Sequence, residues 1–231
     1  EPVVVVTGET EARAYPLQIL MWHEIVNDEI GGAPATITFC PLCNTGIAFD
    51  RRFRGRVLDF GTTGRLRKSN LIMYDRQSET WWQQADGRAI AGRYTGAQLS
   101  FLPIQRASWK EAREGYPEAR VLSRDTGYNR SYGRNPYRGY DAPGNSPFLY
   151  DGLSPPEREE IARVLQVSHR GETEILPYAE LEEHRVSRLE LSGEEIVIFF
   201  DPDTASALDT LAIAEGRAVG SANAHLSRLG D

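Results

Sequence analysis

The strongest constraint on the fold is an internal repeat, because a sequence block that occurs twice predicts a structural unit that is built twice. Shifting the 231-residue sequence by 161 positions sets His184 against His23 and aligns residues 177–209 with residues 16–48 without a gap. The aligned blocks share eight identical residues, where residue frequencies predict about two. The identical pairs are Pro16 and Pro177, Leu20 and Leu181, His23 and His184, Glu29 and Glu190, Gly32 and Gly193, Ile37 and Ile198, Phe39 and Phe200, and Pro41 and Pro202.

Each copy of the repeat is expected to contain a helix, a glycine turn and a strand. Residues 15–26 predict a short helix, with Pro16 in its first turn and the pair Gly31 and Gly32 beyond its end. Residues 35–40 alternate apolar and polar side chains, which is typical of a strand. Turn-forming residues follow from Cys40 to Gly46, so the cysteines are expected at the end of a strand.

The middle of the chain is rich in short strand-like runs. Four runs, at residues 47–49, 56–60, 71–74 and 80–83, are separated by turns that include Asp86-Gly87 and Thr95-Gly96. Ser108 and Glu111 form a capping-box pattern that predicts a short helix ending near Gly115, and residues 154–157 predict a further helix start. We therefore expect a β-rich α+β fold with internally duplicated helix–turn–strand units, antiparallel meander or barrel-like sheets, and a few short helices.

The domain organisation predicted from these patterns has three parts. Residues 1–132 form a first β-rich repeat unit that contains the cysteine turn, and residues 159–231 form a second unit that is expected to be incomplete. Residues 133–158 between them are rich in proline and glycine but also carry several aromatic side chains, so they predict a packed connection and not a free linker.

Charge and hydropathy exclude some classes of partner. Acidic residues outnumber basic ones 33 to 26, and no dense basic block occurs, so a nucleic-acid-binding or anionic-membrane surface is not expected. No apolar run approaches the roughly 18 residues of a membrane span. The chain opens at Glu1 without an initiator methionine, which fits removal of a leader as well as trimming of the sequence. We expect an extracytoplasmic protein, periplasmic or secreted; the sequence identifies no protein partner.

The two cysteines form the most informative motif, because both lie in one Cys40-x-x-Cys43 turn. Two thiols at this spacing can chelate one ion, with each sulfur about 2.3 Å from it. His23 is the natural third ligand and Met73 a candidate fourth. This soft ligand set favours copper, particularly Cu(I), over zinc, because a structural zinc site normally needs a second pair of ligands. A soft-metal-binding protein is therefore the leading prediction.

Other interpretations of the same residues stay open. The cysteine pair also fits thiol–disulfide exchange, although no helix is predicted after it, and a short structural disulfide or a non-catalytic binding module are further alternatives. His23 is also interpretable as a hydrogen-bonded core residue, and Met73 is more readily explained by core packing. The paired aromatics predict either a ligand cleft or, in preference, a core position, and the second copy offers a secondary hard-ion site. The cleft residues are Trp81, Trp82 and Gln83; the hard-ion residues are His184, Asp201 and Asp203.

Five sequence blocks together resemble a known family. They are Tyr15-Pro16, the run from Trp22 to Asp28, the cysteine turn from Cys40 to Gly46, the run from Ser69 to Arg76, and the run from Ser78 to Gln83. As a set they resemble the prokaryotic family catalogued as domain of unknown function 3179, over most of the chain. The resemblance implies a β-rich fold, frequently in exported or membrane-tethered proteins, and it implies no activity.

Overall fold

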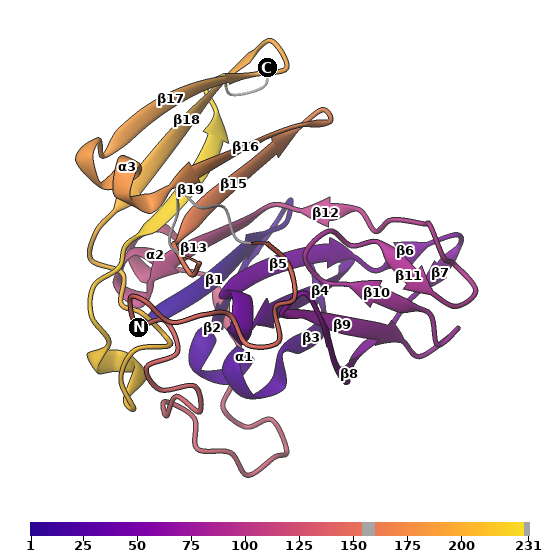
Figure 1. Ribbon diagram of the computed structural model, residues 1–231. Helices are drawn as coiled ribbons and strands as arrows, with labels where there is room; N and C mark the ends of the chain where they lie inside the picture. Colours follow the sequence, from indigo (N-terminus) through magenta and orange to yellow (C-terminus); the bar gives the residue numbers. More distant parts are fainter. Residues whose placement is uncertain (154–159, 229–231) are drawn as a thin grey trace.

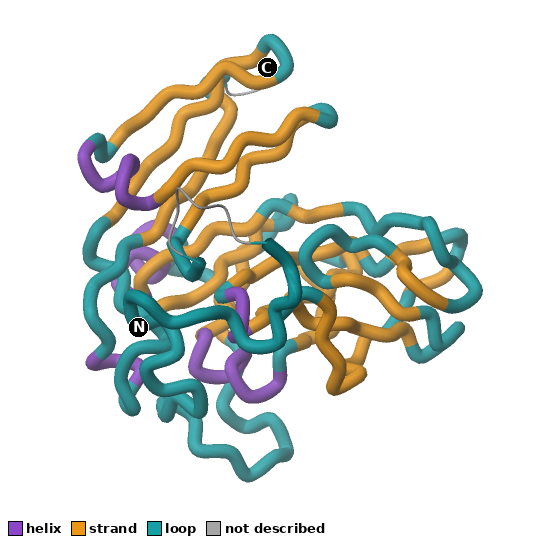
Figure 2. The backbone as a smooth tube through the Cα atoms, in the orientation of Figure 1, coloured by secondary structure: helices purple, strands orange, loops and turns teal. Residues whose placement is uncertain are grey.

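The structure is a computed structural model that describes residues 1–153 and 160–228. Short antiparallel sheets dominate it, the helices are few and short, and no sheet of the described chain closes into a barrel (Figure 2). The predicted duplicated β-rich α+β class is confirmed, in its meander form. None of the helices within these two ranges is both long and apolar enough to cross a bilayer. The helix start predicted at residues 154–157 lies outside the described residues.

The first copy of the repeat consists of a β-hairpin, a helix and three strands of a four-stranded antiparallel sheet. The central one of these three strands is flanked on both sides, and its side chains on both faces are largely buried. The elements in chain order are β1 (Pro2–Thr7), β2 (Ala12–Pro16), α1 (Leu17–His23), β3 (Ile25–Ile30), β4 (Ala33–Cys40), the short 3-10 helix η1 (Pro41–Cys43) and β5 (Thr45–Asp50).

Helix α1 is shorter than the sequence pattern predicts, and the prediction of a helix over residues 15–26 was too long at both ends. Tyr15 pairs with Val4 in the β1–β2 hairpin, and Ile25 pairs with Thr38 in the β3–β4 hairpin. Between them Glu24 has a φ of 60°, which ends the helix. Because strand pairing satisfies the same backbone groups, the flanking hairpins leave only seven residues for the helix.

The second copy repeats this arrangement with the same strand register. Val186 faces Phe199 just as Ile25 faces Thr38, at the offset of 161 residues seen in the sequence. The last strand takes the place of β5, because Asp201 pairs with Ser221 as Cys40 pairs with Thr45. The elements are β15 (Val164–His169), β16 (Glu172–Pro177), α3 (Tyr178–Glu183), β17 (Val186–Leu191), β18 (Glu194–Asp201) and β19 (Ser221–Leu226), in the upper lobe of Figure 1. Between β18 and β19 the short 3-10 helix η2 (Ile213–Glu215) packs through Ile213 against the core of the first copy.

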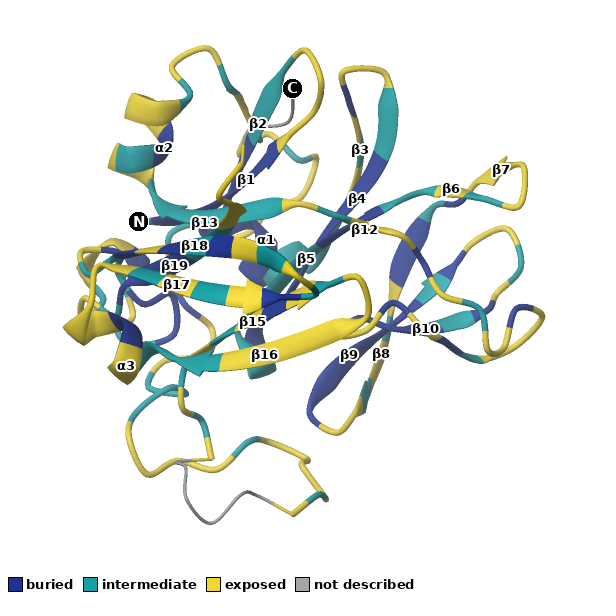
Figure 3. Ribbon diagram, turned by 90° about the horizontal axis from the view of Figure 1, so that it is seen from above, coloured by how far each residue is buried: buried dark blue, intermediate teal, exposed yellow. Residues whose placement is uncertain are grey.

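A four-stranded meander covers the first copy. Its strands lie side by side in chain order, which confirms the predicted meander. Its apolar side chains form one buried cluster with Cys40 and Phe49 of the first copy, and Figure 3 shows β9 as largely buried. The meander strands are β8 (Phe60–Arg67), β9 (Asn70–Asp75), β10 (Trp81–Gln83) and β11 (Ala89–Ala91); the short strands near them are β6 (Arg52–Phe53), β7 (Arg56–Val57) and β12 (Phe101–Leu102).

Strand β13 (Ile104–Ser108) joins the two copies. It pairs with β1 of the first copy, and the Asn223 side chain of β19 bonds both the backbone N–H and the carbonyl of Arg106. The predicted capping box is confirmed at the start of α2 (Trp109–Gly115), which β14 (Arg120–Val121) follows. In the connection that follows, Tyr137 and Tyr140 pack against the core, whereas Phe148 is 55% exposed.

Candidate functional site

The cysteine turn is held at the end of a strand, as the sequence predicts. Cys40 is the last residue of β4 and faces Thr45, the first residue of β5. Pro41 opens the η1 turn with its fixed φ, and Asn44 closes it in the left-handed conformation at a φ of 48°. The Thr45 hydroxyl donates to the Cys43 carbonyl at 2.7 Å, which fixes the second cysteine relative to the strand.

The two thiols are free and have different surroundings. Cys40 is 1% exposed, whereas Cys43 is half-buried. A hydrogen bond from the Cys40 thiol lowers the pKa of Cys43 to about 7, with help from the side chains of Thr45 and Asn70. The same contact, together with burial, raises the pKa of Cys40. The turn therefore holds one ionisable sulfur beside one that stays protonated.

Asn70 supplies the second hydrogen bond to the Cys43 sulfur. Its Nδ2 lies 3.0 Å from Cys43 Sγ and 2.7 Å from Gln84 Oε1, and it is buried at the start of β9. Gln84 Nε2 in turn donates to Thr38 Oγ1 at 3.0 Å. This buried polar network ties the meander to β4 directly behind the cysteine turn, so the amide that faces the sulfur is fixed in place.

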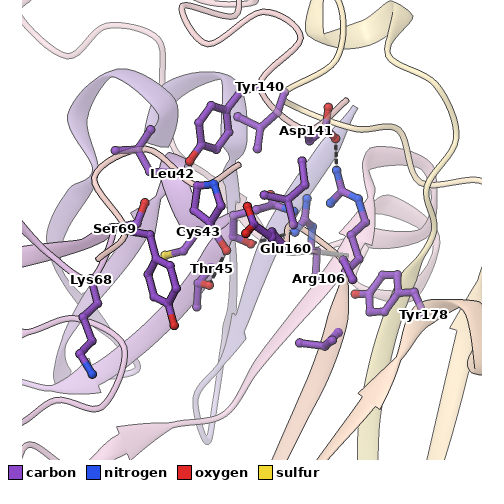
Figure 4. A pocket seen from close by; sticks show the side chains of 18 residues that line it. Leu42, Cys43, Thr45, Lys68, Ser69, Arg106, Tyr140, Asp141, Glu160 and Tyr178 are labelled. Atoms are coloured by element: carbon purple, nitrogen blue, oxygen red, sulfur yellow. Dashed lines mark hydrogen bonds and ion pairs between the residues drawn. The ribbon is translucent and has the colours of Figure 1, made fainter. Parts of the chain in front are cut away.

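Cys43 lines a pocket of about 360 Å³ (Figure 4). The pocket lies where the first copy, strand β13 and the second copy meet, and its walls come from all three. Several charged side chains line the pocket. Arg163 forms an ion pair with Asp141, and Arg106 lies close to the cysteine turn. The carboxylate of Glu160 also lines the wall. The pocket volume falls within the range for a small-molecule site. Other lining residues are Leu42, Asn44, Thr45, Lys68, Ser69, Tyr140 and Tyr178.

Comparison with known protein families identifies the family to which this chain belongs. Residues 1–230 match the family described as "Protein of unknown function (DUF3179)". The chain belongs to the DUF3179 family. No curated protein and no solved structure shows significant similarity to it. The family assignment confirms the resemblance carried by the sequence blocks, and the activity of this DUF3179 chain has to be argued from the pocket itself.

His23 of the DUF3179 chain lies at the end of α1 and contacts aromatic residues. Its Nε2 is 2.5 Å from the Tyr132 hydroxyl, and its ring centroid is 5.5 Å from that of Tyr128. Burial, and then Arg130, lowers the pKa of His23. Within residues 1–153 and 160–228, no three His, Cys, Asp or Glu side chains are grouped to hold a metal ion. The predicted convergence of His23 with Cys40 and Cys43 is thus not seen, because the imidazole ring of His23 contacts Tyr128 and Tyr132 instead.

Three of the other four residues predicted for the first copy are buried. Met73 is fully buried in the cluster that contains Cys40. Trp82 is fully buried and donates from Nε1 to Asp75 at 2.9 Å, and Gln83 is 5% exposed and bonded to Asn70. Trp81 is half-buried, with Arg65 over its ring. The alternation of β10 therefore places Trp82 in the core beneath β4, away from the pocket wall.

The secondary residues of the second copy lie apart from the pocket. His184 is exposed at the end of α3, and Asp203 is exposed after β18. Asp201 is half-buried, accepts the Asp203 backbone N–H at 2.9 Å, and contacts Glu111, whose pKa is raised by burial and by this carboxylate. Asp201 thus bonds local backbone and a neighbouring carboxyl group, and these three residues form no metal-ion group in the described chain.

Two residues of the site were missed from the sequence. Asn70 lies in one of the blocks that carry the family resemblance, at a turn between two strand-like runs, so its place after a β-hairpin turn was a usable signal. Arg106 lies in a short strand with no distinguishing motif. Only the packing of β13 between the two copies brings Arg106 to the cysteine turn.

Proposed function

We propose that this DUF3179 protein exchanges its Cys40–Cys43 dithiol with disulfides, with Cys43 as the nucleophile and Cys40 as the resolving thiol. One observation carries the proposal: Cys43 lines the pocket and accepts a hydrogen bond from Asn70 at 3.0 Å, while the buried Cys40 thiol lies beside it. A sulfur that is ionised near neutral pH and backed by a second thiol is the arrangement that disulfide exchange requires.

The first step is attack by the Cys43 thiolate on one sulfur of a bound disulfide. A sulfur–sulfur bond forms between Cys43 and the substrate, the substrate's own disulfide bond breaks, and one substrate thiolate leaves. With a pKa of about 7, Cys43 is close to half ionised at neutral pH. A thiol with a pKa near the ambient pH combines a high thiolate fraction with retained nucleophilicity.

The second step uses Cys40. The departing substrate thiolate takes the proton of Cys40, and the Cys40 thiolate attacks Cys43 Sγ, which releases the second substrate thiolate. The two cysteines are oxidised to one disulfide and the substrate disulfide is reduced to two thiols. Burial favours the protonated form of Cys40 before the first step, so the two sulfurs keep separate roles.

The thiolate of Cys43 is stabilised without a helix N-terminus. Thioredoxin-like proteins rely on a helix dipole for this purpose, whereas here the turn leads into strand β5. The hydrogen bonds come instead from the Cys40 thiol, the backbone N–H of Thr45 and the side chain of Asn70. These donors thereby take over the role that the helix N-terminus has in helical sites.

The test is chemical. The reduced protein is alkylated with iodoacetamide between pH 5 and 10 and analysed by mass spectrometry; we expect Cys43 to react with a midpoint near pH 7 and Cys40 to be protected. Treatment with 2-hydroxyethyl disulfide is expected to give the Cys40–Cys43 disulfide. Cys40→Ser should stop at a mixed disulfide on Cys43, and Cys43→Ser should not react. An ordinary thiol midpoint, or a mixed disulfide that persists in the unmodified protein, contradicts the proposal.

Soft-metal binding is the second candidate, because two free thiols lie in contact. Cys40 and Cys43 would supply two sulfur ligands, with copper favoured over zinc for the softness of this pair. Protein purified without chelator separates the two candidates. Stoichiometric copper or zinc that is lost in both Cys40→Ser and Cys43→Ser supports metal binding, whereas metal-free protein with reversible oxidation of the pair supports disulfide exchange.

A further inference from the structure

Four buried polar atoms without hydrogen-bond partners belong to residues that line the same pocket. They are Nε and Nη2 of Arg106, Oδ1 of Asn44 and Oγ of Ser69, out of seven such atoms in the described chain. Buried polar groups in folded proteins are nearly always hydrogen-bonded, so each exception calls for a cause. A concentration of exceptions at one pocket, beside an ionisable sulfur, indicates that the pocket is suited to a polar ligand.

Arg106 is the strongest of these groups because it is charged. Its Nη1 donates to the Asn44 carbonyl at 3.3 Å. Its backbone N–H and carbonyl are both hydrogen-bonded to the side chain of Asn223. Burial lowers the pKa of Arg106 to about 10, which still leaves it cationic at neutral pH. Asp141 contributes some compensating charge, but Nε and Nη2 of Arg106 have no hydrogen-bond partner, and a bound anion would supply one.

The unpartnered atoms of Arg106 form one edge of the guanidinium group. Nε–H and one N–H of Nη2 point in parallel, and this edge matches the two oxygens of a carboxylate. Arg163 is a weaker candidate, because its Nη2 already forms an ion pair with Asp141 and a hydrogen bond to Ser206. Lys68 also lines the pocket but its side chain is exposed, so its charge is screened by solvent.

We infer that the pocket binds a low-molecular-weight disulfide that carries a carboxylate, with the Nε and Nη2 edge of Arg106 holding the carboxylate and Cys43 attacking the disulfide. The inference rests on the proposed thiol–disulfide exchange and names its substrate class. The hydrogen bond from Arg106 to the carbonyl of Asn44, the residue after Cys43, keeps the guanidinium group next to the cysteine turn. The pocket volume of about 360 Å³ fits a small molecule and leaves no room for a folded protein domain.

The experiment compares three small disulfides that differ in charge. The reduced protein is mixed at pH 7 with 3,3′-dithiodipropionate, 2-hydroxyethyl disulfide or cystamine, which are anionic, neutral and cationic, and formation of the Cys40–Cys43 disulfide is followed by mass spectrometry. Rates are divided by those of dithiothreitol with the same compounds, which removes their intrinsic reactivity. We expect the normalised rate with the anionic disulfide to exceed the neutral one by about tenfold, because one charged bidentate contact contributes at least this factor.

The variants assign that preference to Arg106. Arg106→Gln should abolish the preference, and Arg106→Lys should retain only part of it, because a lysine keeps the charge but not the fork. Lys68→Gln removes a charge from the same pocket at an exposed position and should change the preference less than twofold. Thermal unfolding and iodoacetamide alkylation of Cys43 check that each variant is folded and that its nucleophile is intact.

Binding without chemistry provides an independent readout. Cys43→Ser protein should bind 3,3′-dithiodipropionate in calorimetry, and adding Arg106→Gln should weaken this binding about tenfold. Equal normalised rates for the three disulfides, or a preference that survives Arg106→Gln, overturn the role of Arg106 while leaving the exchange proposal intact. Failure of every disulfide to oxidise the Cys40–Cys43 pair overturns both.

Discussion

The two copies of the repeat share their strand pairing but differ in what covers the central strand. In the first copy β4 is buried on both faces, and Thr36 and Thr38 are each 0% exposed. In the second copy β18 is buried on one face only, and Phe199, the counterpart of Thr38, is 50% exposed. The same backbone framework therefore exists in a two-sided and a one-sided form.

The difference comes from the segments that connect equivalent strands. After β5 the first copy continues into β6 to β11, and the meander β8–β11 covers the outer face of β4. In the second copy the connection between β18 and β19 contains only the short η2 helix in its described residues. The meander brings Asn70 to the cysteine turn, so a reactive thiol requires both the repeat and the sheet that covers it.

The largest contrast is expected in the cores of the two copies. Phe39 and Phe200 are equivalent, but Phe39 is 1% exposed in the large central cluster and Phe200 is 7% exposed in a smaller one. Phe39→Ala should lower the free energy of unfolding by about 3–5 kcal/mol, the range for a fully buried phenylalanine, and Phe200→Ala should lower it by less. Urea denaturation of both variants measures this. Equal losses would mean that the two copies are equally well packed.

Asn70 tests whether the covering meander also maintains the thiolate. Asn70→Ala should cost about 1–3 kcal/mol, because Gln83, Gln84 and the Ala85 backbone N–H lose a buried partner, and it should raise the pKa of Cys43. Asn70→Asp is the matched variant, since it keeps the acceptor for Gln83 and Ala85 but places a carboxylate beside the sulfur. It too should raise the Cys43 pKa, as iodoacetamide kinetics will show; an unchanged midpoint in both variants would remove Asn70 from the site.

Cys40→Ala separates the hydrogen bond from the rest of the environment. Loss of the thiol donor should raise the pKa of Cys43 from about 7 towards its ordinary range, so its thiolate fraction falls most below pH 7. Since a more basic thiolate is also a better nucleophile, the alkylation rate at pH 6.5 should fall by only about fivefold. Cys40→Ser keeps a donor and should retain part of the effect. A Cys43 midpoint that stays near pH 7 in Cys40→Ala contradicts the assigned role of Cys40.

The smallest change is expected when the cysteines are moved to the second copy. In protein that carries Cys40→Ser and Cys43→Ser, the changes Asp201→Cys and Thr204→Cys place the pair at equivalent positions. Among residues 1–153 and 160–228, no amide side chain bonds Thr204, which is fully buried beside Ser221, so neither new thiol should show a lowered pKa. Alkylation across pH should give midpoints at or above the ordinary thiol value. A midpoint near pH 7 would show that the repeat framework alone creates the reactive thiol.

Local signals in the sequence were sufficient for several elements. The capping box at Ser108 and Glu111, the turn after Cys40 and the meander runs all depend on residues that are close in the chain, and the structure confirms each of them. The helix at residues 15–26 was overextended because the hairpins on both sides compete for its ends. That competition involves partners outside the helix pattern itself.

The alternation of β4 shows where a local pattern is incomplete. Alternating threonine and apolar residues predict a strand with one buried and one solvated face, yet Thr38 is buried and bonded to Gln84 and to the Ile47 carbonyl. A polar face can be buried when another sheet supplies matching hydrogen bonds. The pattern of β4 alone cannot reveal that sheet, since its partner lies 46 residues away.

The sequence by itself determined the duplicated units, the position of both cysteines at a strand end and the family, because these depend on residue identity and short-range spacing. Only the tertiary structure decided which groups face the sulfurs. His23 turns to Tyr132, while Asn70 and Arg106 come to the cysteine turn from the meander and from β13. The reason is physical: a thiol's pKa and its ligand are set by donors and charges within a few ångströms, and chain packing brings these together from distant segments.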